Sequence, residues 1–386
     1  MRNDEGQFPG RGFAGRKTPF YFYDLPLLER TLDAVRSELS TRPHWQVHYA
    51  VKANANPEIL RRIAAAGFGA DCVSGGEVRM AYEAGFDPSV IVYAGVGKSD
   101  DEIAYSLELG IGRFNVESSA ELLVIEEIAA RMGKVAPVSF RVNPDIGAHT
   151  HANITTGLAE NKFGIFHEML PEVIRLAQGC PHIEYKGLHF HIGSQILDMS
   201  DFVALCNRAN NLMDRLEQMG LPVGDINVGG GLGINYEHPN HLPIADFKAY
   251  FDTFKRHLQL RHGQALHFEL GRSIVAPCGT LICRVLYVKQ GTTRQFAIVD
   301  ASMTELIRPA LYHAYHRIEN LTSDEPEQLY DVVGPVCESS DVFGKGVSLD
   351  ACRRGDFIAI RSAGAYGESM ASTYNGRPLP GALFFE

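Results

Sequence analysis

Lys52 is the residue whose type and position most clearly suggest covalent chemistry. Residues 47–51 before it, VHYAV, have the pattern of a strand, and the residues ANANP after it cannot continue one. Burial of a lysine at a strand end disfavours its charged form and lowers its pKa. An amine with a lowered pKa can form a Schiff base with an aldehyde. From this stretch alone, an ordinary surface lysine at a strand end is the alternative.

Other polar residues follow later strand patterns. His189 and His191 are two residues apart in a predicted strand, so both face one side and can bind a metal ion or cover a planar ring. No third metal ligand has a matching spacing, so we expect no metal. Glu269 ends another predicted strand and, if buried, needs a positive partner such as a protonated ring nitrogen. Arg272 can bind a phosphate or a carboxylate through two hydrogen bonds.

A run of three glycines, 229–231, follows a further predicted strand, at a position where barrels frequently bind phosphate on backbone N–H groups. A turn without a ligand is the alternative. The run is not a dinucleotide fingerprint, because positions 234 and 236 are Ile and Tyr. A lysine for an imine, glycines for a phosphate, a histidine for a ring face and a glutamate for a ring nitrogen together indicate pyridoxal 5'-phosphate.

These residues lie where strands end in a repeating strand–helix pattern. Strands are predicted at 47–51, 70–73, 90–94, 113–116, 138–142, 187–192, 225–228 and 266–270. Helices are predicted at 59–66, 76–84, 101–109, 119–132, 170–177, 202–219 and 245–258. The pattern predicts an α/β fold, a (β/α)8 TIM-type barrel with its active site at the C-terminal ends of the strands. A doubly wound open sheet is the alternative.

After Arg272 the pattern changes to short strands at 281–288, 295–299, 330–333 and 356–360, with one weak helix near 309–315. This part predicts a mostly antiparallel β domain. The strand-like residues 19–24 precede the barrel and can join that sheet. We therefore expect an N-terminal arm and strand at 1–25 that joins the β domain, the cofactor-binding barrel at 26–275, and the C-terminal β domain at 276–386.

Composition narrows the possible partners. The chain has 386 residues, 45% hydrophobic and 21% charged, with a net charge of −10, which argues against nucleic acid or an anionic membrane as the main partner. No apolar run resembles a signal peptide or a membrane span. Seven cysteines at irregular spacings indicate neither a disulfide framework nor a metal site. The expected location is the cytoplasm.

A series of short motifs resembles the diaminopimelate decarboxylase family, within the fold type III pyridoxal-phosphate decarboxylases that combine an alanine-racemase-like barrel with a β domain. The motifs, in order, are YAVKAN at 49–54, SGGE at 74–77, KFGI at 162–165, HIGS at 191–194, GGG at 229–231, ELGR at 269–272, RPALY at 308–312, CES at 337–339, GAY at 364–366 and YN at 374–375. The family often has proline where this chain has Leu270.

The resemblance implies how the cofactor is bound. Lys52 holds pyridoxal phosphate as an imine, His191 covers its ring, and Glu269 pairs with its pyridine nitrogen. The implied phosphate-binding residues are Ser194, Gly230, Gly231, Gly271 and Arg272, with Tyr366 close by.

The resemblance also implies a carboxy-lyase that converts meso-2,6-diaminopimelate to L-lysine and CO2, the last step of lysine biosynthesis. Family members are homodimers with the active site at the interface, so Cys337, the implied proton donor, and Glu338 come from the second subunit. The implied substrate-binding residues are Arg272, Arg308, Tyr312, Glu338 and Tyr366.

Related enzymes are the alternatives. Ornithine, arginine and lysine decarboxylases of this fold usually have a Cys-Asp pair where this chain has Cys337-Glu338, and an arginine such as Arg308 suits a substrate tail that bears a carboxylate. A carboxynorspermidine-type decarboxylase is a further alternative. A racemase is disfavoured by Glu269, and a non-catalytic homologue by the presence of Lys52 and Cys337.

Overall fold

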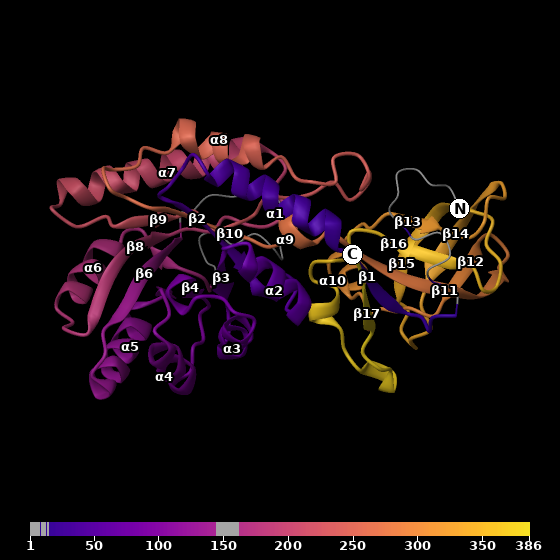
Figure 1. The fold of residues 1–386 in the computed structure, drawn as a ribbon, viewed down its shortest axis with the longest axis horizontal. Helices are drawn as coiled ribbons and strands as arrows, with labels where there is room; N and C mark the ends of the chain where they lie inside the picture. The colour runs from indigo at the N-terminus through magenta and orange to yellow at the C-terminus, as the bar shows by residue number, and fades with distance from the viewer. Residues whose placement is uncertain (1–7, 9–12, 14, 144–161) are drawn as a thin grey trace. The chain divides into compact units, whose positions relative to one another are not determined.

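Strands and helices alternate along most of the chain in the computed structural model, which describes residues 8, 13, 15–143 and 162–386. The chain separates into two units (Figure 1). The barrel unit contains residues 32–233 and 246–271, and the β unit contains residues 1–31, 234–245 and 272–386. Most of the predicted N-terminal arm lies outside the described residues, and the domain boundaries after residues 25 and 275 stay predictions.

A closed barrel of parallel strands forms the centre of the barrel unit. In spatial order its strands are β5 (Arg113–Val116), β4 (Ile91–Tyr93), β3 (Gly69–Cys72), β2 (Trp45–Ala50), β10 (Leu266–Leu270), β9 (Asp225–Asn227), β8 (Ile183–His189) and β6 (Ala136–Asn143). Pairing of β5 with β6 closes the ring, and the short β7 (Ile165–Phe166) extends from β6. The predicted eight-stranded barrel is therefore confirmed.

Helices alternate with these strands around the barrel (Figure 1). They are α2 (Pro57–Ala65), α3 (Gly75–Glu83), α4 (Asp100–Leu109), α5 (Ser119–Met132), α6 (Leu170–Gln178), α7 (Met199–Gln218) and α8 (Phe247–His257). Helix α5 has the predicted bounds because both of its ends carry strong signals. Ser118 accepts a hydrogen bond from the N–H of Glu121 at 3.1 Å, and Gly133 ends the helix at a φ of +62°.

Helix α1 (Leu25–Leu39) is absent from the predicted elements. It begins directly after the strand β1 (Phe20–Asp24), and Pro26 lies in its first turn. Proline is tolerated at the start of a helix, but in a sequence it reads as a break. Because the strand pattern of β1 leads directly to this proline, the sequence gives no clear signal for the beginning of α1.

A buried polar group lies inside the barrel. His48 Nδ1 is 3.0 Å from the carbonyl oxygen of Val90, and His48 Nε2 is 3.0 Å from His267 Nδ1. Burial, together with the neighbouring His267 and Arg113, lowers the pKa of His48 to about 3. His48 is therefore a neutral core residue at ordinary pH.

The β unit is built on one sheet with the strand order β13 (Ile318–Asn320), β16 (Phe357–Ile360), β11 (Gly279–Gln290), β12 (Gln295–Val299), β14 (Glu327–Val333) and β15 (Val342–Asp350). Strand β1 pairs antiparallel with β11 and parallel with β17 (Gly381–Phe385). The short helices α9 (Arg272–Val275) and α10 (Arg308–Tyr312) complete this unit. Most strand pairs are antiparallel, which confirms the predicted class of this part.

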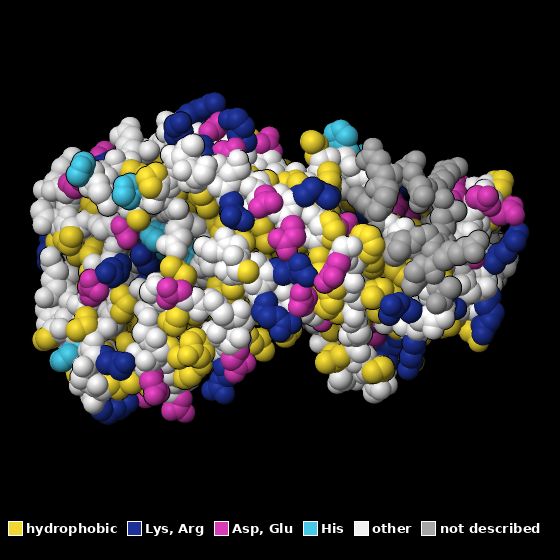
Figure 2. Space-filling view, viewed as in Figure 1, with side chains coloured by type: hydrophobic (Ala, Val, Ile, Leu, Met, Phe, Trp, Pro, Cys, Tyr) yellow, Lys and Arg dark blue, Asp and Glu magenta, His cyan; other side chains and the backbone are white. Residues whose placement is uncertain are grey.

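The described helices include none that is both long enough and apolar enough to cross a membrane. On the face drawn in Figure 2, acidic and basic side chains are interspersed among apolar ones.

Candidate active site

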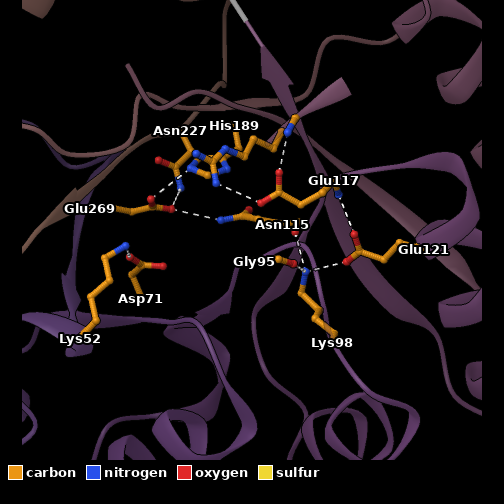
Figure 3. Close-up of polar contacts among 12 residues, drawn as sticks. Lys52, Asp71, Gly95, Lys98, Asn115, Glu117, Glu121, His189, Asn227 and Glu269 are labelled. Atoms are coloured by element: carbon orange, nitrogen blue, oxygen red, sulfur yellow. Dashed lines mark hydrogen bonds and ion pairs between the residues drawn. The ribbon is translucent and has the colours of Figure 1, made fainter. Parts of the chain in front are cut away.

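Lys52 lies at the C-terminal end of β2, in a single 3-10 turn, Val51–Ala53, that follows the strand. Its side chain is 43% exposed, and its Nζ lies 3.9 Å from Oδ2 of Asp71 on β3 (Figure 3). The predicted burial of Lys52 is wrong: the strand ends at Ala50, two residues before Lys52, and the lysine lies in the turn that follows. The buried member of the pair is Asp71, whose pKa is raised by burial and by the charge of Glu269.

Glu269 is a buried carboxylate with an unusually complete set of donors. Its Oε1 accepts hydrogen bonds from Asn115 Nδ2 at 3.1 Å and Asn227 Nδ2 at 2.8 Å, and its Oε2 lies 3.0 Å from His189 Nε2 (Figure 3). Burial alone would raise the pKa of Glu269, but the interactions with His189, His191 and Lys52 hold it well below its ordinary value. Glu269 is therefore an anion at neutral pH.

The glycine run 229–231 follows β9 and packs closely on the neighbouring strand end. A Cβ at Gly230 would collide with the carbonyl oxygen of Glu269, and Gly229 has a φ of +70°, which favours glycine. The N–H of Gly229 donates to Asn227 Oδ1 at 2.9 Å, and that of Gly230 donates to His191 Nδ1 at 3.3 Å. The same asparagine thus contacts both Glu269 and the glycine run.

The segment 190–196 after β8 lies against this glycine run. Ile196 N–H donates to the carbonyl oxygen of Gly231 at 2.9 Å, and a Cβ at Gly231 would lie 2.8 Å from the carbonyl oxygen of Gly193. Ser194 is half-buried within this segment. A Cβ at Gly271, which follows β10, would lie 3.0 Å from the Cβ atoms of Ala50 and Ala53. The barrel unit therefore gathers the predicted cofactor-binding residues of the barrel at its strand ends.

His189 and His191 differ in position and in contacts. The strand predicted for 187–192 is in fact Ile183–His189, so His189 is its last residue and His191 lies beyond it. The prediction that the two imidazoles share one face of a strand is therefore wrong. Burial, with the charges of Arg141 and Lys52, lowers the pKa of His191 well below its ordinary value, so its imidazole is neutral and can stack on a ring.

The β unit contains a second buried cluster, centred on the phenol of Tyr236. Tyr236 Oη accepts hydrogen bonds from Arg272 NH1 at 2.7 Å and from Arg308 NH1 at 3.1 Å. Burial would raise the pKa of this phenol, but the two guanidinium groups bring it below its ordinary value. Tyr236 is absent from the predicted site residues, because it lies beyond the glycine run in a loop that no motif marked.

His316 completes this cluster, which consists of Tyr236, Arg272, Arg308 and His316 and is called the arginine cluster below. Arg308 NH1 lies 2.8 Å from His316 Nε2, and His316 Nδ1 lies 2.8 Å from the carbonyl oxygen of Arg361. His316 must accept from Arg308 and donate to the carbonyl, so it is neutral, and burial beside Arg308 lowers its pKa to about 3. Within the described part of the chain, no Asp or Glu forms an ion pair with Arg308.

Tyr366 and Tyr312 belong to the same cluster. The Arg272 guanidinium carbon lies 4.9 Å from the centre of the Tyr366 ring. Burial alone would lower the pKa of Arg272, but several neighbouring phenols, Tyr312 among them, raise it above its ordinary value. Tyr366 has a φ of +56°, a conformation that a bulky residue adopts at a cost of about 1–3 kcal/mol and that is concentrated at functional sites.

Cys337 and Glu338 lie on the surface of the β unit. The N–H of Cys337 donates to Asn375 Oδ1 at 3.2 Å, and Glu338 Oε1 accepts from Tyr374 Oη at 2.7 Å. All four residues are exposed. The motifs CES and YN, far apart in sequence, are therefore adjacent in the structure.

The strand ends of the barrel unit fit pyridoxal phosphate. Lys52 presents an amine to carry the aldehyde, and Glu269 presents an ionised carboxylate for the ring nitrogen. Gly230 packs so closely on the backbone of Glu269 that a Cβ there would collide with the Glu269 carbonyl oxygen. The described residues contain no group of three His, Cys, Asp or Glu side chains arranged to hold a metal ion.

Fold and donor set together define a pyridoxal-phosphate enzyme of the barrel class. In agreement, the family model described as the pyridoxal-binding domain of pyridoxal-dependent decarboxylases matches residues 26–276.

The relatives of known name show which decarboxylases this chain is similar to in sequence. A diaminopimelate decarboxylase of Bacteroides thetaiotaomicron is 61% identical over 97% of both chains, and one of Vibrio cholerae is 43% identical over 94% of this chain and 86% of its own. The crystal structure of diaminopimelate decarboxylase from Helicobacter pylori complexed with L-lysine superposes with a TM-score of 0.91 at 42% identity, covering 97% of this chain and 93% of that one. The chain belongs to the diaminopimelate decarboxylase family, which confirms the resemblance noted in its sequence.

Proposed function

We propose that this protein decarboxylates meso-2,6-diaminopimelate to L-lysine and CO2 with pyridoxal phosphate as its cofactor, the last step of lysine biosynthesis. The observation that carries the proposal is the buried Glu269 carboxylate, held as an anion by three donors at the strand ends that also present Lys52. The 61% identity to a relative of that name supports the choice of reaction.

When bound, pyridoxal phosphate supplies an electron sink for the breaking bond between the substrate carbon and its carboxyl group. Lys52 provides the amine that attaches the cofactor, and buried Asp71 at 3.9 Å can accept a proton from that amine. Glu269 holds a proton at the ring nitrogen, because an ionised carboxylate in a buried site favours a cationic partner. His191 covers the ring face.

The phosphate of the cofactor is assigned to backbone and hydroxyl donors. In this proposal the backbone of Gly230, Gly231 and Gly271, the hydroxyl of Ser194 and the guanidinium of Arg272 would hold it, with Tyr366 beside Arg272.

Arg308 determines the substrate class in this proposal. It is buried, and its hydrogen bonds go to a phenol and a neutral imidazole rather than to a carboxylate. A substrate with a carboxylate on its tail compensates this charge, whereas lysine or ornithine would leave the guanidinium without an anion. We assign four further residues to binding of the same substrate: Arg272, Tyr312, Glu338 and Tyr366.

We place the catalytic acid on a second copy of the chain. Cys337 and Glu338 are exposed, together with Tyr374 and Asn375, so a partner subunit can reach them. In the homodimer Cys337 delivers a proton to the carbon that has lost CO2, and Glu338 contacts the substrate. The compartment that we propose is the cytoplasm.

The test is CO2 release from meso-diaminopimelate, L-lysine, L-ornithine and L-arginine, each at the same concentration. The proposal expects release from meso-diaminopimelate alone at a substantial rate, and its loss in Lys52→Ala. Preference for ornithine, lysine or arginine would replace the substrate and keep the cofactor chemistry. Full activity of Cys337→Ala would remove that residue from the mechanism.

A further inference from the structure

We propose that His189 is a positioning residue for Glu269, and that together with Asn115 and Asn227 it fixes the plane and the charge of this carboxylate toward the ring nitrogen of the cofactor. This inference rests on the proposed function, since it assigns a purpose to groups behind Glu269. His189 itself contacts Glu269 and does not bind the cofactor in this proposal.

The three donors come from three different strands. Asn115 belongs to β5, His189 ends β8 and Asn227 ends β9, while Glu269 belongs to β10. All four side chains are buried, and the donor distances are 3.1, 3.0 and 2.8 Å (Figure 3). Because the donors approach from several directions, rotation of the carboxylate would break at least one hydrogen bond.

The Glu269 carboxylate can accept one hydrogen bond more than these three donors supply. An ionised carboxylate has about four acceptor positions, and the asparagines fill both on Oε1 while His189 takes one on Oε2. The remaining position on Oε2 can accept one further N–H. A protonated ring nitrogen supplies a donor of that kind.

The imidazole of His189 has one tautomer that satisfies this arrangement. Within the described residues, His189 Nδ1 has no hydrogen-bond partner, and Glu269 Oε2 can only accept. A proton on Nε2 makes the hydrogen bond, whereas a proton only on Nδ1 would leave a buried N–H without an acceptor and two acceptors facing each other. His189 therefore donates to Glu269.

Asn115 is itself held from behind. The buried Lys98 donates to the carbonyl oxygens of Asn115 at 2.9 Å and Gly95 at 2.7 Å, and pairs with Glu121 at 2.6 Å. The side chain of Lys98 is 1% exposed, so its ammonium group interacts with protein atoms rather than with solvent. This contact fixes the peptide from which the Asn115 amide reaches Glu269 (Figure 3).

Other charged and titratable groups also act on Glu269, and they must be kept constant in a test. The groups on the surrounding barrel elements are His48, Lys52, Asp71, Arg113, His191, Tyr250 and His267. His189 differs from these groups in the hydrogen bond of 3.0 Å that its Nε2 makes with Oε2 of Glu269. Substitution of His189 alone therefore isolates its contribution.

The matched variants are His189→Leu, which removes the donor, and His189→Gln, whose amide nitrogen can replace Nε2. The readout is the 15N chemical shift of the ring nitrogen in labelled pyridoxal phosphate bound to the holoenzyme, with the cofactor dissociation constant between pH 5.5 and 8.5. Asn115→Ala removes a donor to Oε1 and serves if His189→Leu does not fold.

In the unchanged protein we expect a protonated ring nitrogen across this range. His189→Leu should shift the signal toward the unprotonated nitrogen, weaken cofactor binding about tenfold, with the largest loss at low pH, and lower kcat at least tenfold. His189→Gln should recover most of each loss. A merely structural contribution would not move the ring-nitrogen signal.

Folded His189→Leu with an unchanged 15N signal and unchanged cofactor affinity would overturn the inference. So would equal effects in His189→Leu and His189→Gln. Failure of the proposed function looks different: the unchanged protein would release no CO2 from meso-diaminopimelate, while the ring-nitrogen signal would still respond to His189→Leu.

Discussion

The barrel unit and the β unit each bury a charged cluster, and the two clusters are compensated in opposite ways. Glu269 in the barrel unit receives three hydrogen bonds from neighbouring strands, so its negative charge is largely satisfied before any ligand arrives. Arg308 in the β unit interacts with the Tyr236 hydroxyl and the neutral imidazole of His316, and its positive charge is not cancelled by a carboxylate of the described residues.

The difference separates two kinds of task. A carboxylate fixed by several donors is preorganised, which suits a group that must hold one proton in one place throughout a reaction. A buried guanidinium held by neutral partners has a strong demand for an anion, which suits recognition of a substrate. We therefore associate the barrel cluster with cofactor chemistry and the arginine cluster with specificity.

The largest effect expected in the arginine cluster is that of Arg308→Met. Removal of one partner of a buried charge pair costs about 2–5 kcal/mol in binding, so kcat/KM for meso-diaminopimelate should fall roughly 30- to 4,000-fold. The free energy of unfolding should stay unchanged or rise, because the variant no longer buries this charge. Steady-state kinetics and urea denaturation measure the two quantities.

Arg353→Met is the matched control, since Arg353 is an exposed arginine of the same unit that pairs with Glu325. It should leave kcat/KM unchanged. If Arg308→Met kept full activity, or lost stability while retaining specificity, the arginine cluster would be structural and the contrast with the barrel cluster would fail.

A smaller effect is expected for Tyr236→Phe. The variant keeps the aromatic ring and removes the oxygen that Arg272 and Arg308 share at 2.7 and 3.1 Å. A hydrogen bond to a charged group contributes about 1.5–3 kcal/mol, so KM for meso-diaminopimelate should rise roughly tenfold, with a smaller change in kcat. Kinetics equal to those of the unchanged protein would show that the phenol does not organise the two arginines.

A further effect concerns the pH dependence of stability and is common to both units. His48 in the barrel unit and His316 in the β unit each have a pKa of about 3 in the folded protein. Unfolding restores a pKa near 6.5, so the unfolded state binds more protons between these values and stability falls as the pH decreases from about 6.5 toward 3. At pH 5 each histidine should lower the free energy of unfolding by about 2 kcal/mol relative to pH 7.5.

Urea denaturation at pH 7.5 and 5.0 measures this dependence. His48→Asn and His316→Asn should each reduce the difference between the two pH values, whatever their effect on absolute stability. A difference that survives both substitutions would assign the pH dependence to other groups, and a dependence on only one histidine would distinguish the two units.

The sequence predicts regular elements well where their ends carry local signals. The strand β5 and helix α5 agree with their predicted bounds, because Ser118 and Gly133 mark the helix. Strand β15 was beyond prediction: its two glycines and its lysine weaken the alternation that identifies a strand, and its pairing with β14 comes from tertiary structure.

The candidate site, too, could be predicted from the sequence only where local signals mark its residues. Lys52, Glu269 and the glycine run carry signals in their own residue types, but their environment depends on distant segments. The donors Asn115 and Asn227 are short polar residues at the ends of strands, and only closure of the barrel brings them to Glu269. A search for polar residues within otherwise apolar strands would have identified them as candidates.

The central claim is that Lys52 carries the cofactor at the strand ends that also present Glu269. The most direct measurement is borohydride reduction of the cofactor-loaded protein, followed by proteolysis and mass spectrometry of the modified peptide. We predict one reduced pyridoxyl group per chain, on Lys52, and none in Lys52→Ala. Modification of a different lysine, or stoichiometric cofactor binding that leaves Lys52 unmodified, would contradict the claim.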